Sequence, residues 1–281
     1  MKFSIITPVF NAVETLEKTI LSVINQSRDS ELEYIIVDGG SPDGSLEIIE
    51  RYRDKIDILI SEKDRGVYDA MNKGISRATG DIIGIINSDD WYNEGALKNV
   101  EQVFKETPEI YIVYSPIENY FDGKYLNTFV PGNLENLIYK FTINHPSCFV
   151  KNSVYEQVGL YDLSYSIAAD YDFIFRAYTS GVKFRQIETP LTSYSLNGMS
   201  GKPLNKFQQI RESWRVAAKM ARQTSRELEV KRRNFYLVWV LKELAVLPVK
   251  QVINPQIRRK LKSLVRQIIG GKLPSDHYGS W

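Results

Sequence analysis

The first hundred residues alternate between two sequence patterns, and this alternation restricts the fold more than any other feature. Apolar runs at residues 3–10, 33–40, 56–62 and 81–87 are rich in Ile and Val, which is typical of buried strands. Stretches with apolar residues at helical spacing follow the first three runs. Such repetition favours a parallel, doubly wound sheet with helices on both faces. The sequence therefore predicts an α/β fold.

The helix after the first run is expected to begin at Asn11, with Glu14 in the position of a capping-box acid. From about residue 110 the strand patterns become shorter, and two helices are predicted within 154–162 and 169–181. From about Pro203 the chain is helical and charged. We therefore expect a catalytic domain at 1–202, with halves 1–100 and 101–202, and a helical extension at 203–281.

Composition excludes several classes of protein. A single cysteine, Cys148, excludes an internal disulfide, and two histidines make a histidine-rich zinc site unfavourable. No signal peptide and no ordinary membrane-spanning run is evident. The net charge is only +2, yet eleven Lys or Arg and one acid lie between Val230 and Leu273. The body is therefore acidic, which disfavours a nucleic-acid binder, whereas the basic tail suggests an anionic surface as its partner.

Carboxylates follow two of the predicted strands at the point where each strand ends. Asp38 ends one run, and Asp89 and Asp90 follow another. Ligands of open α/β sheets bind beyond the carboxyl ends of the strands. Asp38 could accept a hydrogen bond from a base or a ribose, or it could cap the turn at Gly39 and Gly40. The adjacent pair suits Mg²⁺ or Mn²⁺, although one acid of such a pair often caps a helix.

Three other segments carry polar residues with two possible roles each. Arg65 and Asp69 flank a helix start that could attract a diphosphate, or they could form a solvated helix face. Asp170 and Asp172 begin a helix, where the dipole favours acids, but one of them could be a general base. His145 could contact an acceptor or a metal, or it could be a structural hydrogen bonder.

Five segments in order, TPVFNA, VDGGSPDGS, DRGVYDAMNKG, NSDDW and ADYDFIFRAYTSG, make the chain similar to the family 2 glycosyltransferases. The resemblance covers roughly residues 1–200 and is greatest to bacterial members that build surface polysaccharide or O-antigen. It implies a GT-A fold, which is a Rossmann-like mixed sheet flanked by helices. It also implies metal-dependent, inverting transfer of a sugar from a nucleotide-diphospho-sugar, usually a UDP-sugar, to a hydroxyl of a saccharide acceptor, with Mn²⁺ or Mg²⁺ as the cation.

The resemblance also implies roles for individual residues. Ala169 stands where the family often has a glutamate before its catalytic aspartate, so an acid that helps to bind the acceptor is absent here. Residues 194–202 resemble a segment that folds over the donor. The implied roles are a nucleotide pocket at Thr7, Pro8 and Asn11; the base at Asp38; donor contacts at Arg65, Asp69 and Asp89; the metal at Asp90; the catalytic base at Asp170; and the acceptor or lid at His145, Asn197, Gly198 and Ser200.

Residues 234–250 and 253–272 form the basic, helical tail. The second stretch has apolar residues at helical spacing among Lys and Arg, which is typical of a helix at a membrane surface. The alternative is a helical hairpin packed on the catalytic domain or on a second subunit. Because similar enzymes often use acceptors linked to a polyprenyl diphosphate, we expect a cytoplasmic enzyme that is peripheral at the inner leaflet.

Two other functions compete with the transferase. A non-catalytic protein of the same fold could bind a sugar nucleotide without turnover. A nucleotidyltransferase is disfavoured because TPVFNAVET lacks a glycine-rich phosphate loop bearing Lys or Arg. A dehydrogenase is disfavoured because DGGSPDGS is not the glycine pattern of a dinucleotide fold.

Overall fold

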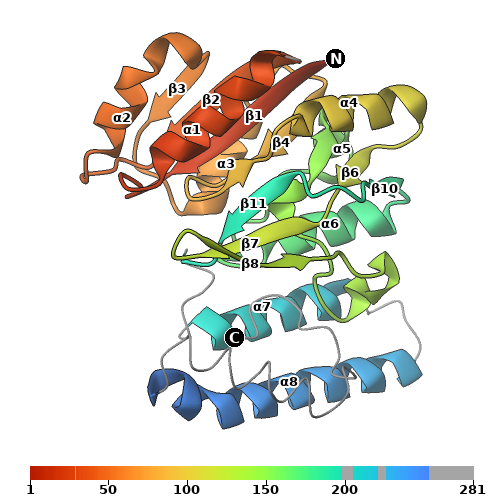
Figure 1. Cartoon of the computed structure of the whole chain (residues 1–281). Coiled ribbons are helices and arrows are strands. Elements are labelled where there is room, and N and C mark those ends of the chain that lie inside the picture. The colour runs from red at the N-terminus through yellow and green to blue at the C-terminus, as the bar shows by residue number, and fades with distance from the viewer. Residues whose placement is uncertain (29, 198–204, 221–225, 253–281) are drawn as a thin grey trace. The chain divides into compact units, whose positions relative to one another are not determined.

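Two compact units make up the chain (Figure 1). The sheet unit comprises residues 1–134 and 143–197, and the helical unit comprises residues 135–142 and 198–281. The computed structural model describes residues 1–28, 30–197, 205–220 and 226–252. Residues 135–142, which the sequence placed with the catalytic domain, group with the C-terminal helices.

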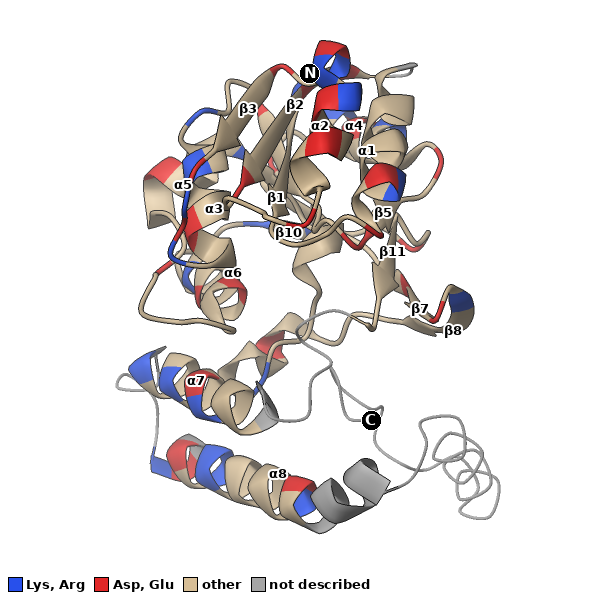
Figure 2. Ribbon diagram, turned by 90° about the vertical axis from the view of Figure 1, so that its left-hand side faces the viewer, with Lys and Arg blue, Asp and Glu red and all other residues tan. Residues whose placement is uncertain are grey.

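The sheet unit contains two sheets with helices on both faces of the larger one. Its helices are α1 (Leu16–Ile24), α2 (Ser45–Arg51), α3 (Val67–Ile75), α4 (Ala96–Glu106), α5 (Asn152–Val158) and α6 (Ala169–Thr179). Short 3-10 helices are η1 (Asn25–Arg28), η2 (Arg53–Lys55) and η4 (His145–Ser147), and η3 (Leu134–Ile138) begins at the end of the unit's first segment. Helices α1, α2 and α4 lie on one face of the larger sheet and α3, α5 and α6 on the other (Figures 1 and 2).

The larger sheet is mixed, which confirms the predicted architecture. Its strand order is β10-β6-β9-β4-β1-β2-β3. Strands β1 to β4 run parallel to their neighbours within this group, whereas β9 runs antiparallel to both β4 and β6. The strands are β1 (Lys2–Val9), β2 (Glu31–Asp38), β3 (Ile58–Ser61), β4 (Ile82–Ile85), β6 (Ile112–Tyr114), β9 (Phe149–Lys151) and β10 (Phe184–Gln186).

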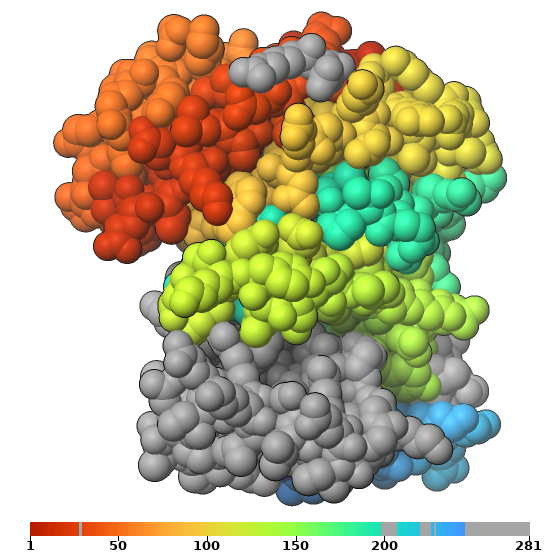
Figure 3. All heavy atoms as spheres, viewed as in Figure 1, coloured from red at the N-terminus to blue at the C-terminus, as the bar shows by residue number. Residues whose placement is uncertain are grey.

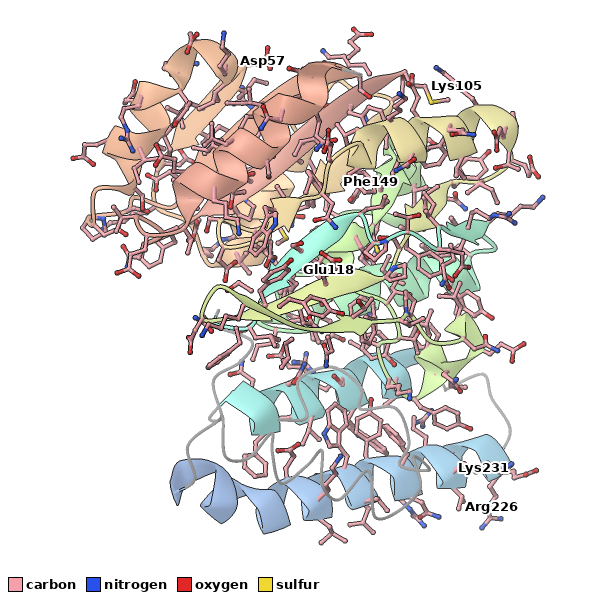
Figure 4. All side chains as sticks on the ribbon, in the orientation of Figure 1. Asp57, Lys105, Glu118, Phe149, Arg226 and Lys231 are labelled. Carbon is pink, nitrogen blue, oxygen red and sulfur yellow. The ribbon has the colours of Figure 1, made fainter. Side chains whose placement is uncertain are left out.

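The register of the parallel strands aligns their carboxyl ends at one edge of the larger sheet. Val9 pairs with Asp38, and Asp38 pairs with Ser61. Side chains of β1, β2 and β4 are buried on both faces, as expected of strands covered by helices on each side. Phe149 of β9 lies in the same core (Figure 4). At Gly84 a Cβ atom would lie 2.7 Å from Ile5 and 2.9 Å from Phe149, so only glycine fits there.

The smaller sheet was not anticipated. Its order is β5-β11-β7-β8, formed by β5 (Trp91–Tyr92), β11 (Thr192–Ser195), β7 (Ile117–Phe121) and β8 (Lys124–Phe129). Strand β7 has Glu and Asn between its apolar residues and was missed, because the sequence suggested a hairpin-like extension with strands at residues 110–116 and 124–130. Trp91 pairs with Ser193, so β5, which follows Asp90, lies beside β11. The β7–β8 hairpin forms part of the surface in Figure 3.

Helix α1 begins later than predicted. It starts at Leu16 rather than at Asn11, and Asn11 adopts a left-handed backbone with φ 52°. The Asn11 amide donates to the Ser41 hydroxyl, and the Val13 amide donates to the Asp43 carboxylate. These contacts bind residues 11–15 as a turn to the loop after β2, and Glu14 therefore does not complete a capping box at Asn11.

The helical unit is built around two antiparallel helices, α7 (Asn205–Met220) and α8 (Arg226–Val252) (Figure 1). Its core contains Ile210, Ala217 and Tyr236, and the Trp214 and Tyr236 rings meet edge to face at 5.1 Å. The basic stretch predicted at 253–272 lies outside the described residues. Among the helices that the structure describes, none has the length and apolarity needed to cross a bilayer.

Candidate active site

Polar side chains from five segments follow one another along the carboxyl edge of the larger sheet. A Cβ atom on Gly39 would lie 2.4 Å from Asp64, so the loops after β2 and β3 touch. Asp64 lies just before α3 in the sequence. Tyr68 of α3 donates a hydrogen bond to Asp170. Asp170 lies beside His145, and His145 is in turn close enough to Asp89 to oppose the rise in the pKa of Asp89. The structure therefore places Asp38, Asp89 and Asp170 along the carboxyl edge of the larger sheet. This is expected if ligands bind beyond the carboxyl ends of its strands.

Asp38 is buried and holds the loop that follows it. Its Oδ2 accepts hydrogen bonds from the Ser61 hydroxyl at 2.7 Å and from the Gly40 amide at 3.2 Å. Its Oδ1 accepts one from the Ser41 amide at 3.1 Å. This is the turn-capping role that the sequence left open, and the contact with a nucleotide base stays a prediction.

Asp69 and Arg65 form a closed pair at the start of α3. The Asp69 carboxylate accepts hydrogen bonds from the Arg65 amide and guanidinium, both at 3.1 Å. Burial by itself would raise the pKa of Asp69, but these hydrogen bonds and the charges of Arg65 and Lys73 lower it. The Arg65 side chain is 77% exposed, so its guanidinium remains accessible to an anionic ligand.

Asp90 is fully buried, and both of its carboxylate oxygens are engaged. Oδ1 accepts a hydrogen bond from the Ser195 amide at 2.8 Å, and Oδ2 accepts one from the Asn87 side chain at 2.9 Å. Burial, and next the charge of Asp89, raise the pKa of Asp90 well above its ordinary value. Asp90 therefore fastens the end of β4 to β11.

Asp89 has a different environment from its neighbour. It is partly exposed, and none of the described residues that surround it donates a side-chain hydrogen bond to its carboxylate. Burial raises its pKa, and the nearby His145 opposes this shift. A carboxylate that is poorly hydrated and lacks side-chain donors is stabilised by a cation, so Asp89 has free ligand capacity that Asp90 lacks.

Asp170 lies at the first turn of α6 and is held from three sides. Its Oδ1 accepts hydrogen bonds from the Tyr171 amide at 2.8 Å and the Tyr68 hydroxyl at 3.1 Å. Its Oδ2 lies 3.4 Å from Nδ1 of His145. Asp172 has another role, because it pairs with Arg176 at 2.7 Å, and Arg176 binds backbone carbonyls at Val158 and Leu160. Of the two acids considered as a base, only Asp170 faces the edge residues.

The remaining predicted residues are placed less uniformly. Thr7 is fully buried, and its hydroxyl pairs with that of Tyr34 at 3.1 Å, so its role in a nucleotide pocket stays a prediction. Pro8 is likewise buried, whereas Asn11 is exposed beside the loop after β2. Asn197 donates to Asp122 at 3.1 Å. Gly198 and Ser200, predicted to belong to a lid, lie outside the described residues.

Tyr68 was missed by the sequence reasoning. It is buried, and its hydroxyl donates to the Ile167 carbonyl at 2.7 Å as well as to Asp170. Its neighbour Asp69 drew attention because it is charged. The only available signal was the position of a tyrosine in the first turn of a helix that follows a strand end.

Comparisons with known proteins place the chain in a family. The model of the Glycosyl transferase family 2 matches residues 4–157. A PGL/p-HBAD biosynthesis glycosyltransferase of Mycobacterium bovis is 29% identical over 211 residues, which cover 73% of this chain and 81% of that protein. The amylovoran biosynthesis glycosyltransferase AmsB of Erwinia amylovora is 29% identical over 215 residues, which cover 70% of each protein.

Two solved structures share the fold. The S. aureus TarS fragment 1-349 in complex with UDP matches with a TM-score of 0.65 and 18% identity, covering 93% of this chain and 78% of that one. The mannosyltransferase PcManGT from Pyrobaculum calidifontis, in complex with GDP-Man and Mn²⁺, matches with a TM-score of 0.65 and 16% identity, covering 95% and 80%.

Proposed function

Because the chain belongs to glycosyl transferase family 2, we propose that it moves a sugar from a nucleotide-diphospho-sugar to a hydroxyl of a saccharide acceptor, with inversion at the anomeric carbon. The observation that carries this proposal is the environment of Asp170, a buried carboxylate held at the carboxyl edge of the sheet beside His145. An alcohol is a poor nucleophile, so a base at this position is what glycosyl transfer needs.

The proposed reaction uses Asp170 as the base. Oδ1 already accepts two hydrogen bonds, so Oδ2 receives the proton of the acceptor hydroxyl. As the proton leaves, the hydroxyl oxygen bonds to the anomeric carbon. The bond from that carbon to the diphosphate breaks, and its electron pair departs with the diphosphate. Attack from the face opposite the leaving group inverts the configuration.

We infer that Asp89, rather than Asp90, is the residue of the pair that would hold a divalent cation. Asp90 is fully buried with both oxygens engaged, whereas Asp89 lacks side-chain donors. Within the described part of the chain, no group of three or more acids, histidines or cysteines could hold a metal by itself. A single carboxylate is enough for Mn²⁺ or Mg²⁺, which is commonly bound by one or two carboxylates together with substrate phosphates. When bound, the cation offsets charge on the departing diphosphate.

A thermal-shift and turnover experiment tests the proposal. We expect UDP with Mn²⁺ to raise the unfolding midpoint more than UDP alone, because a ligand that binds only the native state stabilises it. GDP and dTDP serve as matched nucleotides, since solved neighbours hold both UDP and GDP-Man. Release of UDP from UDP-sugars in the presence of alkyl glycosides would separate an enzyme from a protein that only binds sugar nucleotides. No stabilisation by any of the three nucleotides would contradict the proposal.

For the partner of the C-terminal segment, we propose the anionic inner leaflet of the membrane, where a polyprenyl-diphosphate-linked acceptor would be found. Helix α8 carries an exposed apolar stripe, in which Leu237, Leu241 and Leu244 are 51–56% exposed. Their intervals of four and three residues place them on one side of the helix. Arg233 and Lys242 are also exposed on α8, and Figure 2 marks its basic residues. An apolar stripe with basic neighbours is typical of helices at a membrane surface.

Sedimentation with lipid vesicles tests the membrane proposal. We expect the full chain to bind vesicles of phosphatidylcholine with 30 mol% (about one lipid in three) phosphatidylglycerol, and to bind pure phosphatidylcholine less. Leu241→Glu should weaken binding about tenfold because it removes buried apolar area. Val130→Glu is the matched control, since Val130 is 62% exposed but lies in the sheet unit. Equal binding by both variants would contradict the proposal.

A further inference from the structure

His145 is held rigidly at the carboxyl edge, although it lies far from the strand ends that mark the site in the sequence. It begins η4, directly before β9. The Ser147 hydroxyl donates to the carbonyls of Ser115 and Asn144, both at 2.9 Å, and the Cys148 amide donates to the His145 carbonyl at 2.9 Å. These hydrogen bonds hold the backbone of His145 in place, and the His145 side chain is only 13% exposed.

Asp170 presents two unequal oxygens to its surroundings. Oδ1 accepts hydrogen bonds from the Tyr68 hydroxyl and the Tyr171 amide, which use its capacity. Oδ2 faces Nδ1 of His145 at 3.4 Å and keeps room for one further donor. The oxygen available to react is therefore the one that His145 contacts.

The other imidazole nitrogen is an unsatisfied polar atom. Nε2 of His145 is buried and has no hydrogen-bond partner among the residues that the structure describes. In the neutral tautomer whose Nδ1 proton points to this carboxylate, Nε2 is an acceptor. A buried acceptor without a donor is costly, so this atom is placed to receive a donor from a ligand.

We propose that His145 is the positioning residue of the base Asp170 and also a binding residue for the acceptor saccharide. Its Nδ1–H fixes Oδ2 of Asp170 in line with the attacking hydroxyl, and its Nε2 accepts a hydrogen bond from a second hydroxyl of the same saccharide. Ala169, the residue before Asp170, offers no polar side chain for this purpose. The proposal rests on the proposed glycosyl transfer and adds a polyhydroxylated acceptor, bound through at least two hydroxyls.

Two substitutions separate the two nitrogens. His145→Asn keeps a donor near the position of Nδ1 and removes Nε2, whereas His145→Gln keeps a polar group near Nε2 and removes Nδ1. For transfer from a UDP-sugar to an alkyl glycoside, we expect H145N to raise the KM for the glycoside about tenfold with kcat within about threefold of wild type. We expect H145Q to lower kcat about tenfold, and neither to change the KM for the donor.

Hydrolysis of the UDP-sugar, with water as the acceptor, provides a second measurement. Water makes no second contact, so H145N should hydrolyse the donor at the wild-type rate, whereas H145Q should still be about tenfold slower. Ser147→Ala is the matched control in η4, because it loosens the helix without touching Asp170, and it should leave kcat and both KM values unchanged.

The outcomes distinguish this proposal from the one on which it rests. Wild-type kcat and KM values in both His145 variants, with UDP release intact, would overturn the role of His145 alone. Equal losses in H145N, H145Q and S147A would also overturn it, since they would show that η4 only needs to be rigid. Absence of UDP release by the wild-type enzyme would instead contradict the proposed glycosyl transfer.

Discussion

The two edges of the larger sheet hold buried acids in opposite electrostatic states. At the amino-terminal edge, Glu33 accepts hydrogen bonds from Ser4, Thr79 and Lys2. Burial alone would raise the pKa of Glu33, but these hydrogen bonds lower it to about 2. At the carboxyl edge, burial raises the pKa of Asp89 and of Asp90. One edge therefore stabilises the fold through its charge, and the other keeps unfavourable charge where a ligand can relieve it.

The largest effect should come from Asp170→Asn at the carboxyl edge. Removal of a positioned base typically lowers kcat about 10²–10⁴-fold, and we expect a loss in this range. The midpoint of thermal unfolding should change little, because Asn can still accept hydrogen bonds from Tyr68 and Tyr171. Steady-state UDP release and calorimetry measure both. Turnover within tenfold of wild type would remove Asp170 from its role.

Asp89→Asn should lower turnover about 10³-fold, because a bound cation contributes several kcal/mol to a charged transition state. The same variant should unfold at a higher temperature than wild type when ligand-free at pH 7.5, since a group whose pKa is raised by folding destabilises the native state when ionised. Mn²⁺ with UDP should stabilise the wild type but not the variant.

Glu94→Gln is the matched control for Asp89→Asn, because Glu94 is a nearby exposed acid in the next loop, between β5 and α4. It should leave turnover, the unfolding temperature and the response to Mn²⁺ unchanged. If Asp90→Asn, rather than Asp89→Asn, abolished the response to Mn²⁺ in a folded protein, the assignment within the pair would be reversed.

Glu33→Gln should show the converse behaviour at the amino-terminal edge. We expect it to lower the free energy of unfolding by about 2 to 3 kcal/mol at pH 7, with turnover at 25 °C (about room temperature) unchanged. The folded pKa of about 2 lies below the ordinary value of 4.5, so this stability is present above pH 4.5 and is lost as the pH falls towards 2. Urea unfolding of both proteins across this range should show the difference shrinking. A constant difference would contradict the electrostatic explanation.

The smallest effect is expected for Tyr68→Phe. It removes one of two hydrogen bonds to Oδ1 of Asp170 and keeps the ring. A single hydrogen bond of this kind is worth about 1 kcal/mol, so kcat should fall less than about tenfold. A loss as large as that of Asp170→Asn would show that Tyr68 touches the reacting atoms itself.

Sequence patterns sufficed where the chain repeats one simple unit. Strands β1, β2 and β4 are buried on both faces, so their apolar runs are distinct in the sequence, and the ends of β2 and β4 located Asp38, Asp89 and Asp90. The distinction between Asp89 and Asp90 could not be predicted, because it depends on the Ser195 amide, 105 residues further along the chain. The contact of Thr7 could not be predicted for a related reason, since its partner Tyr34 lies on the neighbouring strand.

The search for site residues at strand ends also assumes that the strands are parallel. It missed site residues where the strands are short or antiparallel. β7 alternates polar and apolar residues over only five positions and gives no distinct signal, whereas β9 lies within the strand indicated at residues 144–151, whose antiparallel direction the sequence did not show. Tyr68 and His145 were undervalued because their importance comes from contacts with Asp170, which lies on a separate helix.

Strand β9 runs antiparallel to both of its neighbours, so the chain reaches the working edge before this strand instead of after it. The proposed donor contacts come from the first hundred residues, whereas the proposed acceptor contacts return through the middle of the same sheet. Residues 130–144, which precede η4, make no pairing within this sheet. Insertions or exchanges in that stretch would therefore leave the pairing and register of the larger sheet unchanged.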